Sequence, residues 1–195
     1  MGSIYEEWRR RETTVTLDVR IEWTSYTSPV GPLTLVTCES GPLLVEFPGR
    51  ALETRWQERM RAQFPKVQIE FGPCSALRAW LDAYFSGTPL PFAFPYHLGR
   101  FFELSPAMVV VTRAMWEIPF GQTRSYDEIA RATGLNARQV GQLVGANHLA
   151  ICIPCHRVVG KGGELTGYGG GLPKKRWLLD HELRSAGLVL QFPGA

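Results

Sequence analysis

The sequence lacks any long hydrophobic segment. Its longest apolar runs, such as Ala107 to Val111, are far shorter than the roughly 20 residues that a membrane-spanning helix needs. Residues 6–12 are rich in charge, so no apolar core follows a basic N-terminal segment and a secretory signal is not expected. Position 6 is Glu, where a myristoylation motif needs Ser or Thr. These absences predict a cytoplasmic protein without a membrane anchor.

Cysteine is also scarce. The four cysteines, Cys38, Cys74, Cys152 and Cys155, form no repeated pair pattern. In a reducing compartment they would be free thiols, metal ligands or nucleophiles. A zinc site made of Cys38, Cys74 and a histidine such as His97 is a minor alternative, because no ligand spacing supports it. We therefore expect no metal and no other cofactor.

Composition is ordinary for a globular protein, but charge is distributed unevenly. Hydrophobic residues make up 45% and charged residues 20% of the chain, and the net charge is +3. Residues 1–99 hold ten basic and eleven acidic side chains, whereas residues 100–195 hold eleven and seven. The basic excess therefore lies in the second half, as an anionic partner would require.

That second half contains the most reactive pattern, Ile-Pro-Cys-His-Arg at residues 153–157. A free thiol with a pKa of about 8.5 is only roughly 3% ionised at neutral pH, and positive charge or an imidazole nearby lowers that pKa. Pro154 suits the first turn of a helix, which would place Cys155 among unpaired backbone N–H groups. The alternative is an inert, buried structural cysteine, but the neighbouring His156 and Arg157 favour a nucleophile.

The first half reads as a scaffold of strands and helices. Alternating or short apolar segments predict strands at 13–23, 33–38, 43–47 and 67–71, and amphipathic segments predict helices at 51–64 and 75–85. Residues 28–32 predict a turn, and the stretch from 87 to 99, rich in Pro and Gly, is the best candidate for a linker.

The second half predicts a helix-turn-helix. Ser105 and Pro106 begin a helix that runs to about Glu117. Further helices are expected at 126–133, capped by Ser125 and ended by Gly134, and at 137–145, capped by Asn136. Two short helices around a three-residue turn containing Gly are typical of DNA-binding motifs, although a plain helical hairpin looks the same.

The segments after the cysteine contain many glycines. Residues 160–163 predict a basic loop, and residues 166–171 predict either a mobile loop or backbone that approaches a flat ligand. A last helix is expected from Pro173, on which Glu182 would be a surface charge or the group that orients His156.

Pro154 to Val158 resembles the O6-alkylguanine-DNA alkyltransferases. The likeness extends in order and spacing over about residues 105–183, and residues 28–33 resemble the N-terminal hairpin of that family. The matching segments are residues 118–126, residues 138–141, Asn147, residues 167–170 and residues 175–182.

This resemblance implies two domains. Residues 1–98 would form an α/β scaffold with a ribonuclease H-like three-stranded sheet and helices. Residues 99–195 would form a mostly α-helical domain with a winged-helix-like helix-turn-helix that binds DNA and accepts the alkyl group.

It also implies direct reversal of DNA damage in duplex DNA that carries O6-alkylguanine, by a protein that acts once and is a monomer. Cys155 would attack the alkyl carbon of a flipped base, His156 would take the thiol proton through a water, and Glu182 would polarise the imidazole. Asn147 would be the hinge between the helix-turn-helix and the active-site loop. The resemblance assigns DNA contacts to Tyr126, Arg138, Ala137, Gln139, Gly141 and Lys161, with Arg138 filling the gap left by the base, and a substrate pocket to Val158, Tyr168 and Gly169.

Two departures from the family pattern leave alternatives open. His148 stands where the family usually has proline, and Cys152 creates a Cys-x-x-Cys spacing with Cys155. That spacing would suit a thiol redox protein, although no βαβ pattern surrounds it. An inert Cys155 would instead leave a lesion-binding protein that performs no repair.

Overall fold

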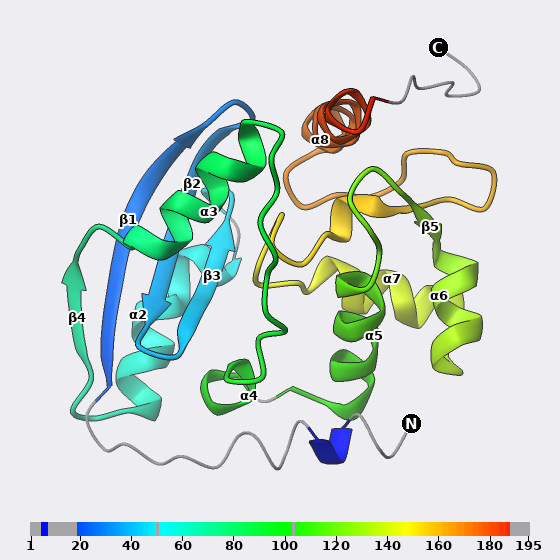
Figure 1. Ribbon diagram of the computed structural model, residues 1–195. Coiled ribbons are helices and arrows are strands. Elements are labelled where there is room, and N and C mark those ends of the chain that lie inside the picture. Colours follow the sequence, from blue (N-terminus) through cyan, green and yellow to red (C-terminus); the bar gives the residue numbers. More distant parts are fainter. Residues whose placement is uncertain (1–4, 8–18, 50, 103, 188–195) are drawn as a thin grey trace.

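The computed structural model describes residues 5–7, 19–49, 51–102 and 104–187. Its elements are β1 (Arg20–Ser28), β2 (Gly31–Cys38), β3 (Gly41–Glu46), α2 (Ala51–Gln63), β4 (Gln68–Phe71), α3 (Ser75–Phe85), α4 (Leu98–Phe101), α5 (Pro106–Trp116), β5 (Arg124–Ser125), α6 (Tyr126–Thr133), α7 (Ala137–Gly145), the 3₁₀ turn η1 (Cys155–Arg157), β6 (Val158–Val159) and α8 (Leu172–Ser185). Figure 1 shows two parts side by side, a sheet with α2 and α3 and a group of helices that includes α5, α6 and α7. The domain boundary between residues 98 and 99 stays a prediction.

The sheet is mixed and has four strands, in the order β3-β2-β1-β4. β1 and β2 form an antiparallel hairpin, whereas β4 lies parallel to β1. The number of three strands implied by the resemblance is therefore wrong, because residues 68–71 add a short strand beyond the hairpin. The alternation at residues 67–71 itself predicts that strand.

The first strand ends later than its sequence pattern predicts. β1 runs to Ser28, so the turn predicted at residues 28–32 shrinks to Pro29 and Val30, while residues 13–18 of the predicted strand lie outside the described residues. Beyond Trp23, buried and exposed residues continue to alternate, with Thr24 and Tyr26 on the buried side. Both carry polar atoms, so a pattern based on hydrophobicity does not count them as buried positions. Gly31 has a φ of +101°, which glycine adopts without strain.

The helices of the second half match their local signals. The Ser105 hydroxyl accepts from the amide of Met108 at the start of α5, and Asn136 does the same for Gln139 at the start of α7. At α6, Ser125 and Glu128 form a reciprocal capping box, and Gly134 ends the helix in the left-handed conformation. The predicted helix-turn-helix is therefore confirmed as a structural unit, with β5 and β6 pairing beside it.

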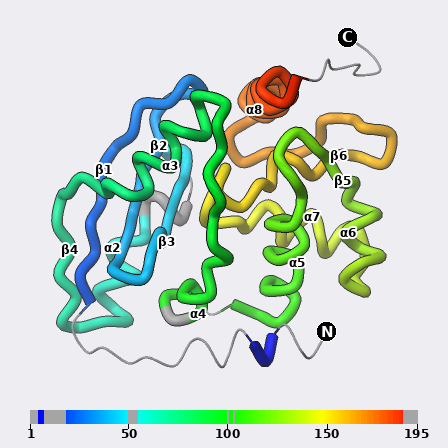
Figure 2. The backbone as a smooth tube through the Cα atoms, viewed as in Figure 1, coloured from blue at the N-terminus to red at the C-terminus, as the bar shows by residue number. Residues whose placement is uncertain are grey.

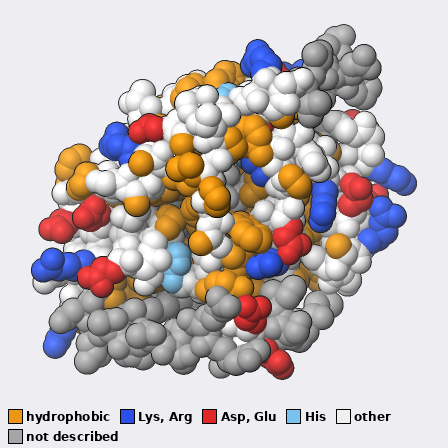
Figure 3. Space-filling model, viewed as in Figure 1, with side chains coloured by type: hydrophobic (Ala, Val, Ile, Leu, Met, Phe, Trp, Pro, Cys, Tyr) orange, Lys and Arg blue, Asp and Glu red, His pale blue; other side chains and the backbone are white. Residues whose placement is uncertain are grey.

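The two parts meet along the free edge of β3. Val45 on β3 donates its amide to the His148 carbonyl at 2.9 Å and accepts from the amide of Ala150 at 2.8 Å. Figure 2 shows this segment, which precedes Cys155, passing between β3 and α7. The segment joining α3 to α4 also runs along the junction, where Figure 3 shows hydrophobic side chains gathered. The cysteine loop is therefore held by both parts of the molecule.

No helix in the described part of the chain is both long enough and apolar enough to cross a membrane.

Candidate active site

Cys155 lies in a single 3₁₀ turn of three residues. The helix whose first turn Pro154 was expected to suit is limited to this 3₁₀ turn, which ends at Arg157 before the chain continues into β6. The amide of Cys155 already donates to the Ile153 carbonyl at 2.8 Å, so the thiol is not activated by a helix N-terminus. Cys155 is 8% exposed. Activation must therefore come from neighbouring side chains.

Asn147 supplies a hydrogen-bond donor to that thiol. Its Nδ2 donates to Cys155 Sγ at 3.2 Å and to the Ile153 carbonyl at 2.9 Å, while its Oδ1 accepts from the amide of Leu149. One buried amide therefore joins the end of α7 to the cysteine turn and supplies a donor that stabilises a thiolate. His148 does not disturb this geometry, since its ring lies tilted against that of Phe102 and its carbonyl accepts from Val45 on β3.

The turn between Asn147 and Cys155 contains a strained residue. Ile151 has a φ of +72°, which costs about 1–3 kcal/mol for a residue that is not glycine. Two hydrogen bonds across Ile151 hold it in place, because Cys152 N donates to Ala150 O and Ile153 N donates to Leu149 O, both at 2.8 Å. Surrounding structure thus imposes the path that presents Cys155.

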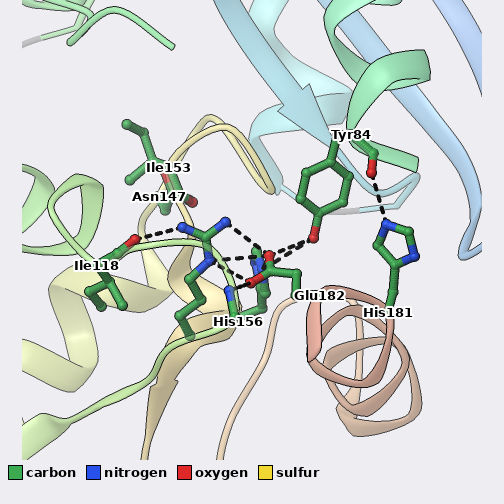
Figure 4. A network of polar contacts seen from close by, with 9 residues as sticks. Tyr84, Ile118, Asn147, Ile153, His156, His181 and Glu182 are labelled. Carbon is green, nitrogen blue, oxygen red and sulfur yellow. Dashed lines mark hydrogen bonds and ion pairs between the residues drawn. The ribbon is translucent and has the colours of Figure 1, made fainter. Parts of the chain in front are cut away.

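His156, Arg157 and Glu182 form a buried ionic network behind the cysteine (Figure 4). His156 Nε2 donates to Glu182 Oε1 at 2.7 Å, and Arg157 donates to Glu182 through Nε at 2.8 Å and Nη2 at 2.9 Å. The Gly121 amide and the Tyr84 hydroxyl also donate to this carboxylate. Burial raises the pKa of Glu182, but the His156 and Arg157 contacts outweigh it and hold that pKa well below its ordinary value. Glu182 is therefore an ionised, buried anchor, and its interpretation as a surface charge is wrong.

The protonation state of His156 follows from these contacts. Burial lowers its pKa, the Glu182 carboxylate opposes this, and Arg157 and Lys175 reinforce it. The ring is therefore neutral at neutral pH. Because Nε2 faces an ionised carboxylate it carries the proton, so Nδ1 holds the lone pair. Nδ1 is buried and has no hydrogen-bond partner among the described residues.

A cavity of about 230 Å³ opens beside Cys155. It is lined by Glu46, Phe47, Tyr126, Gly141, Val144, Gly145, Asn147, Ala150, Cys155, Gly167, Tyr168, Gly169 and Gly170. Glu46 and Phe47 form the wall from the sheet part, and the Phe47 ring packs edge-on against Tyr168. A Cβ at Gly170 would come within 2.6 Å of the Phe47 ring, so this glycine permits close packing between the two parts of the protein.

Lys175 is a buried cation near Cys155 to which the sequence assigned no role. It is fully buried, and its Nζ donates to the carbonyls of Val158 at 2.6 Å and Thr166 at 2.7 Å. Burial lowers its pKa to about 8, which the Cys155 thiolate opposes by attraction. A helical signal identifies it, since Lys175, Leu178, Leu179 and Glu182 share one buried face of α8.

The predicted site residues fall into separate groups. Tyr126, Gly141, Tyr168 and Gly169 line the cavity with Cys155 and Asn147. Val158 does not line it, and its carbonyl accepts from Lys175.

The residues predicted to contact DNA lie mainly on α7. Arg138 and Gln139 are exposed there, and Ala137 is half-buried. The Gln139 side chain accepts from the amide of Asn136 and so helps to cap the helix. Lys161 is exposed in a surface depression beside α6, away from the cavity.

The other interpretations of the cysteines find little support. Cys152 is buried, burial raises the pKa of its thiol, and it lines a different cavity from Cys155. Both are free thiols. His97 uses Nε2 to bond the Pro42 carbonyl, and the described residues contain no group of three or more His, Cys, Asp or Glu that could hold a metal ion.

Fold and site together define a class of protein, a helix-turn-helix protein with a cysteine nucleophile beside its second helix. Two family models match the chain. One, described as "6-O-methylguanine DNA methyltransferase, ribonuclease-like domain", covers residues 21–98, and the other, "6-O-methylguanine DNA methyltransferase, DNA binding domain", covers residues 107–184.

Individual proteins agree with the family models. The methylated-DNA–protein-cysteine methyltransferase of Mycobacterium bovis is 39% identical over 165 residues, which span 83% of this chain and 92% of that protein. An inducible one from Bacillus subtilis is 44% identical over 109 residues, 54% of this chain and 58% of that protein. The crystal structure of Mycobacterium tuberculosis OGT in complex with DNA has a TM-score of 0.68 and 34% identity, covering 84% of this chain and 94% of that one. The chain therefore belongs to the methylated-DNA–protein-cysteine methyltransferase family.

Proposed function

We propose that this protein repairs alkylated DNA directly, by moving the alkyl group from O6 of a flipped guanine to Cys155 in a single turnover. One observation carries the proposal, the surroundings of the Cys155 thiol. The thiol accepts a hydrogen bond from Asn147, lies next to the hydrogen-bonded pair of His156 and Glu182, and borders a cavity with α7 in its wall. Membership of the methylated-DNA–protein-cysteine methyltransferase family supports the same chemistry.

The proposed step is one displacement at the alkyl carbon. Cys155 Sγ forms a bond to that carbon while the bond from the carbon to O6 breaks, leaving a thioether on the protein and guanine in the DNA. The thiol proton passes through a water to His156 Nδ1, and guanine regains one proton, with the Tyr126 hydroxyl as the proposed donor. The thiol loses one proton to His156 and the released guanine gains one from Tyr126, and proton exchange with water then returns the imidazolium and the phenolate to their neutral forms. A thioether sulfur is not displaced by water or thiols under ordinary conditions, so each molecule acts once.

The surroundings of the thiol fit this role. A neutral imidazole with a free Nδ1 lone pair can take the proton, and the ionised Glu182 stabilises the imidazolium that results. The thiolate is stabilised by the Asn147 donor at 3.2 Å and by attraction to the buried ammonium of Lys175.

The surface of α7 fits close approach of DNA. A Cβ at Gly145 would meet nothing within 4 Å, and one at Gly141 would make only an ordinary contact with Tyr126. Packing inside the protein therefore does not require these glycines, and their small size leaves room for a partner. Base flipping costs a few kcal/mol, which phosphate contacts and insertion of the exposed Arg138 into the stack would offset.

The deciding experiment is intact-mass measurement after incubation with a duplex that contains one O6-methylguanine. Wild type and Cys152→Ser are expected to gain one methyl group, which peptide mapping places on Cys155. Cys155→Ser is expected to stay unmodified and still bind the duplex. An unmodified wild-type protein that binds the lesion would mean a non-catalytic lesion binder, and dependence on Cys152 would favour the redox interpretation.

The mechanism also supports a cytoplasmic location and a monomeric state. Cys155 must remain a reduced thiol until it meets its substrate, and all four cysteines are free, which supports action in the cytoplasm. One chain supplies the nucleophile, the base, the acid and the cavity wall, so we propose that the protein works as a monomer.

A further inference from the structure

Tyr84 lies on α3, in the sheet part of the molecule, and yet reaches the catalytic network of the other part. It is fully buried, and its hydroxyl lies 2.7 Å from Glu182 Oε1 and 3.4 Å from His156 Nε2. The ring packs edge-on against Phe120. Figure 4 shows the phenol pointing from α3 toward the carboxylate on α8.

The direction of these contacts follows from protonation. Burial, the charge of Glu182 and the hydrogen bond to it raise the pKa of the Tyr84 phenol well above its ordinary value. The hydroxyl therefore stays protonated and donates to Glu182 Oε1. His156 Nε2 donates to the same oxygen. The 3.4 Å between the Tyr84 hydroxyl and His156 Nε2 is therefore the distance between two donors that share one acceptor, not a hydrogen bond between them.

Two residues of α8 form hydrogen bonds with Tyr84. Glu182 accepts from the hydroxyl, and the preceding residue, His181, contacts the Tyr84 backbone carbonyl through Nε2 at 2.8 Å. The sheet part therefore contacts both the turn that carries Cys155, through the bonds of Val45 to the cysteine loop, and the Glu182 carboxylate, through Tyr84.

We propose that Tyr84 is a positioning residue through which the sheet part fixes the His156–Glu182 pair, an inference that rests on the proposed alkyl transfer. Its hydroxyl occupies a lone pair of Oε1 and sets where Nε2–H of His156 points, which keeps Nδ1 available for the thiol proton. It also withdraws charge from the carboxylate, which limits how basic the imidazole becomes. The other groups that act on the imidazole are Glu182 and Lys175 from α8 and Arg157 from η1.

The test compares Tyr84→Phe with a matched control. Tyr26→Phe also removes a phenol hydroxyl that donates at 2.7 Å to a carboxylate, Asp82 on the same helix α3, but away from Glu182. Two rates are measured against pH for each variant: methyl transfer from a methylated duplex, and alkylation of Cys155 by iodoacetamide without DNA, localised by peptide mapping. Thermal unfolding reports stability.

For Tyr84→Phe we expect transfer about tenfold slower, and an acid limb of the pH profile moved upward by about half to one unit. Loss of one hydrogen bond to a charged group shifts the pKa of that group by about one to two units, and the shift of His156 is smaller because Tyr84 acts on the imidazole through Glu182. Tyr26→Phe should lose stability without either change. Identical rates and profiles in the two variants would overturn the proposal.

Two further outcomes are separable. If wild type transfers no methyl group, the proposed function fails, whereas the iodoacetamide profile still reports whether Tyr84 tunes the pair. If Tyr84→Phe does not fold, replacement of Tyr84 by 3-fluorotyrosine keeps ring and hydroxyl but makes a stronger donor. The acid limb should then move downward, and an unchanged limb would refute the positioning role.

Discussion

Replacement of Glu182 by Gln tests the buried network directly. The change keeps the side-chain shape but removes the charge, and it puts an NH₂ group where an oxygen accepted hydrogen bonds. Every neighbour of that carboxylate is a donor: His156, Tyr84 and Arg157 on Oε1, and Arg157 and the Gly121 amide on Oε2. Whichever way the Gln amide is turned, its NH₂ group therefore faces other hydrogen-bond donors instead of acceptors.

The expected cost follows from burial. Glu182 is fully buried and Arg157 is 8% exposed, so Glu182→Gln leaves a guanidinium largely desolvated without its partner. Breaking a buried pair in this way costs about 3–5 kcal/mol. At this chain length each kcal/mol lowers Tm by about 2–4 °C, so a fall of roughly 6–20 °C is expected at pH 7.

The dependence on pH has a definite sign. The pKa of Glu182 is lower in the folded protein than in the unfolded chain, so its contribution is present above the ordinary carboxyl pKa of about 4.3 and is lost as the pH falls toward the folded value. The difference between wild type and Glu182→Gln should therefore shrink below pH 4.

Urea unfolding of both proteins at several pH values is the assay. Glu117→Gln serves as the control, because Glu117 forms an exposed ion pair with Arg113 at 2.7 Å and exposed pairs contribute about 0–1 kcal/mol. A Glu182→Gln protein as stable as this control at pH 7, or a difference that does not change with pH, would refute the reasoning.

Three other predictions concern the thiol and its surroundings. Lys175→Met should slow alkylation of Cys155 by iodoacetamide, because it removes the ammonium that stabilises the thiolate. Burial lowers the pKa of Lys175 to about 8, below its value in the unfolded chain, so the stability of wild type relative to the variant should rise between pH 8 and 10. A stability difference in urea unfolding that stays constant over this range would contradict this. Asn147→Ala should slow transfer about tenfold or more and destabilise the protein, since three carbonyl or thiol acceptors lose their donor, and wild-type single-turnover kinetics would speak against this. Arg138→Ala should weaken repair of a methylated duplex more than reaction with the free alkylated base, and equal losses with both substrates would rule out its role in the stack.

Local chemistry was enough to predict much of the second half. The caps Ser105, Ser125 and Asn136 and the glycine at 134 place α5, α6 and α7 within a residue of their observed bounds, because a cap bonds backbone groups only a few residues away. α8 begins one residue before the Pro173 at which the sequence predicted it, whereas the burial of Lys175 and Glu182 on its inner face was not predicted.

Contacts distant in sequence were decided only by tertiary structure. No local pattern shows that Tyr84 lies against Glu182, 98 residues away, or that Val45 pairs with the loop before Cys155. The strain at Ile151 and the single turn at Cys155 likewise depend on surrounding packing, which overrides the local preference for a helix after Pro154. The sequence alone was enough to predict Cys155 as the nucleophile. The His156 imidazole, the Glu182 carboxylate and the Tyr84 hydroxyl come together only because folding brings α3, the cysteine loop and α8 to one buried point, where each unpaired polar group would otherwise cost free energy.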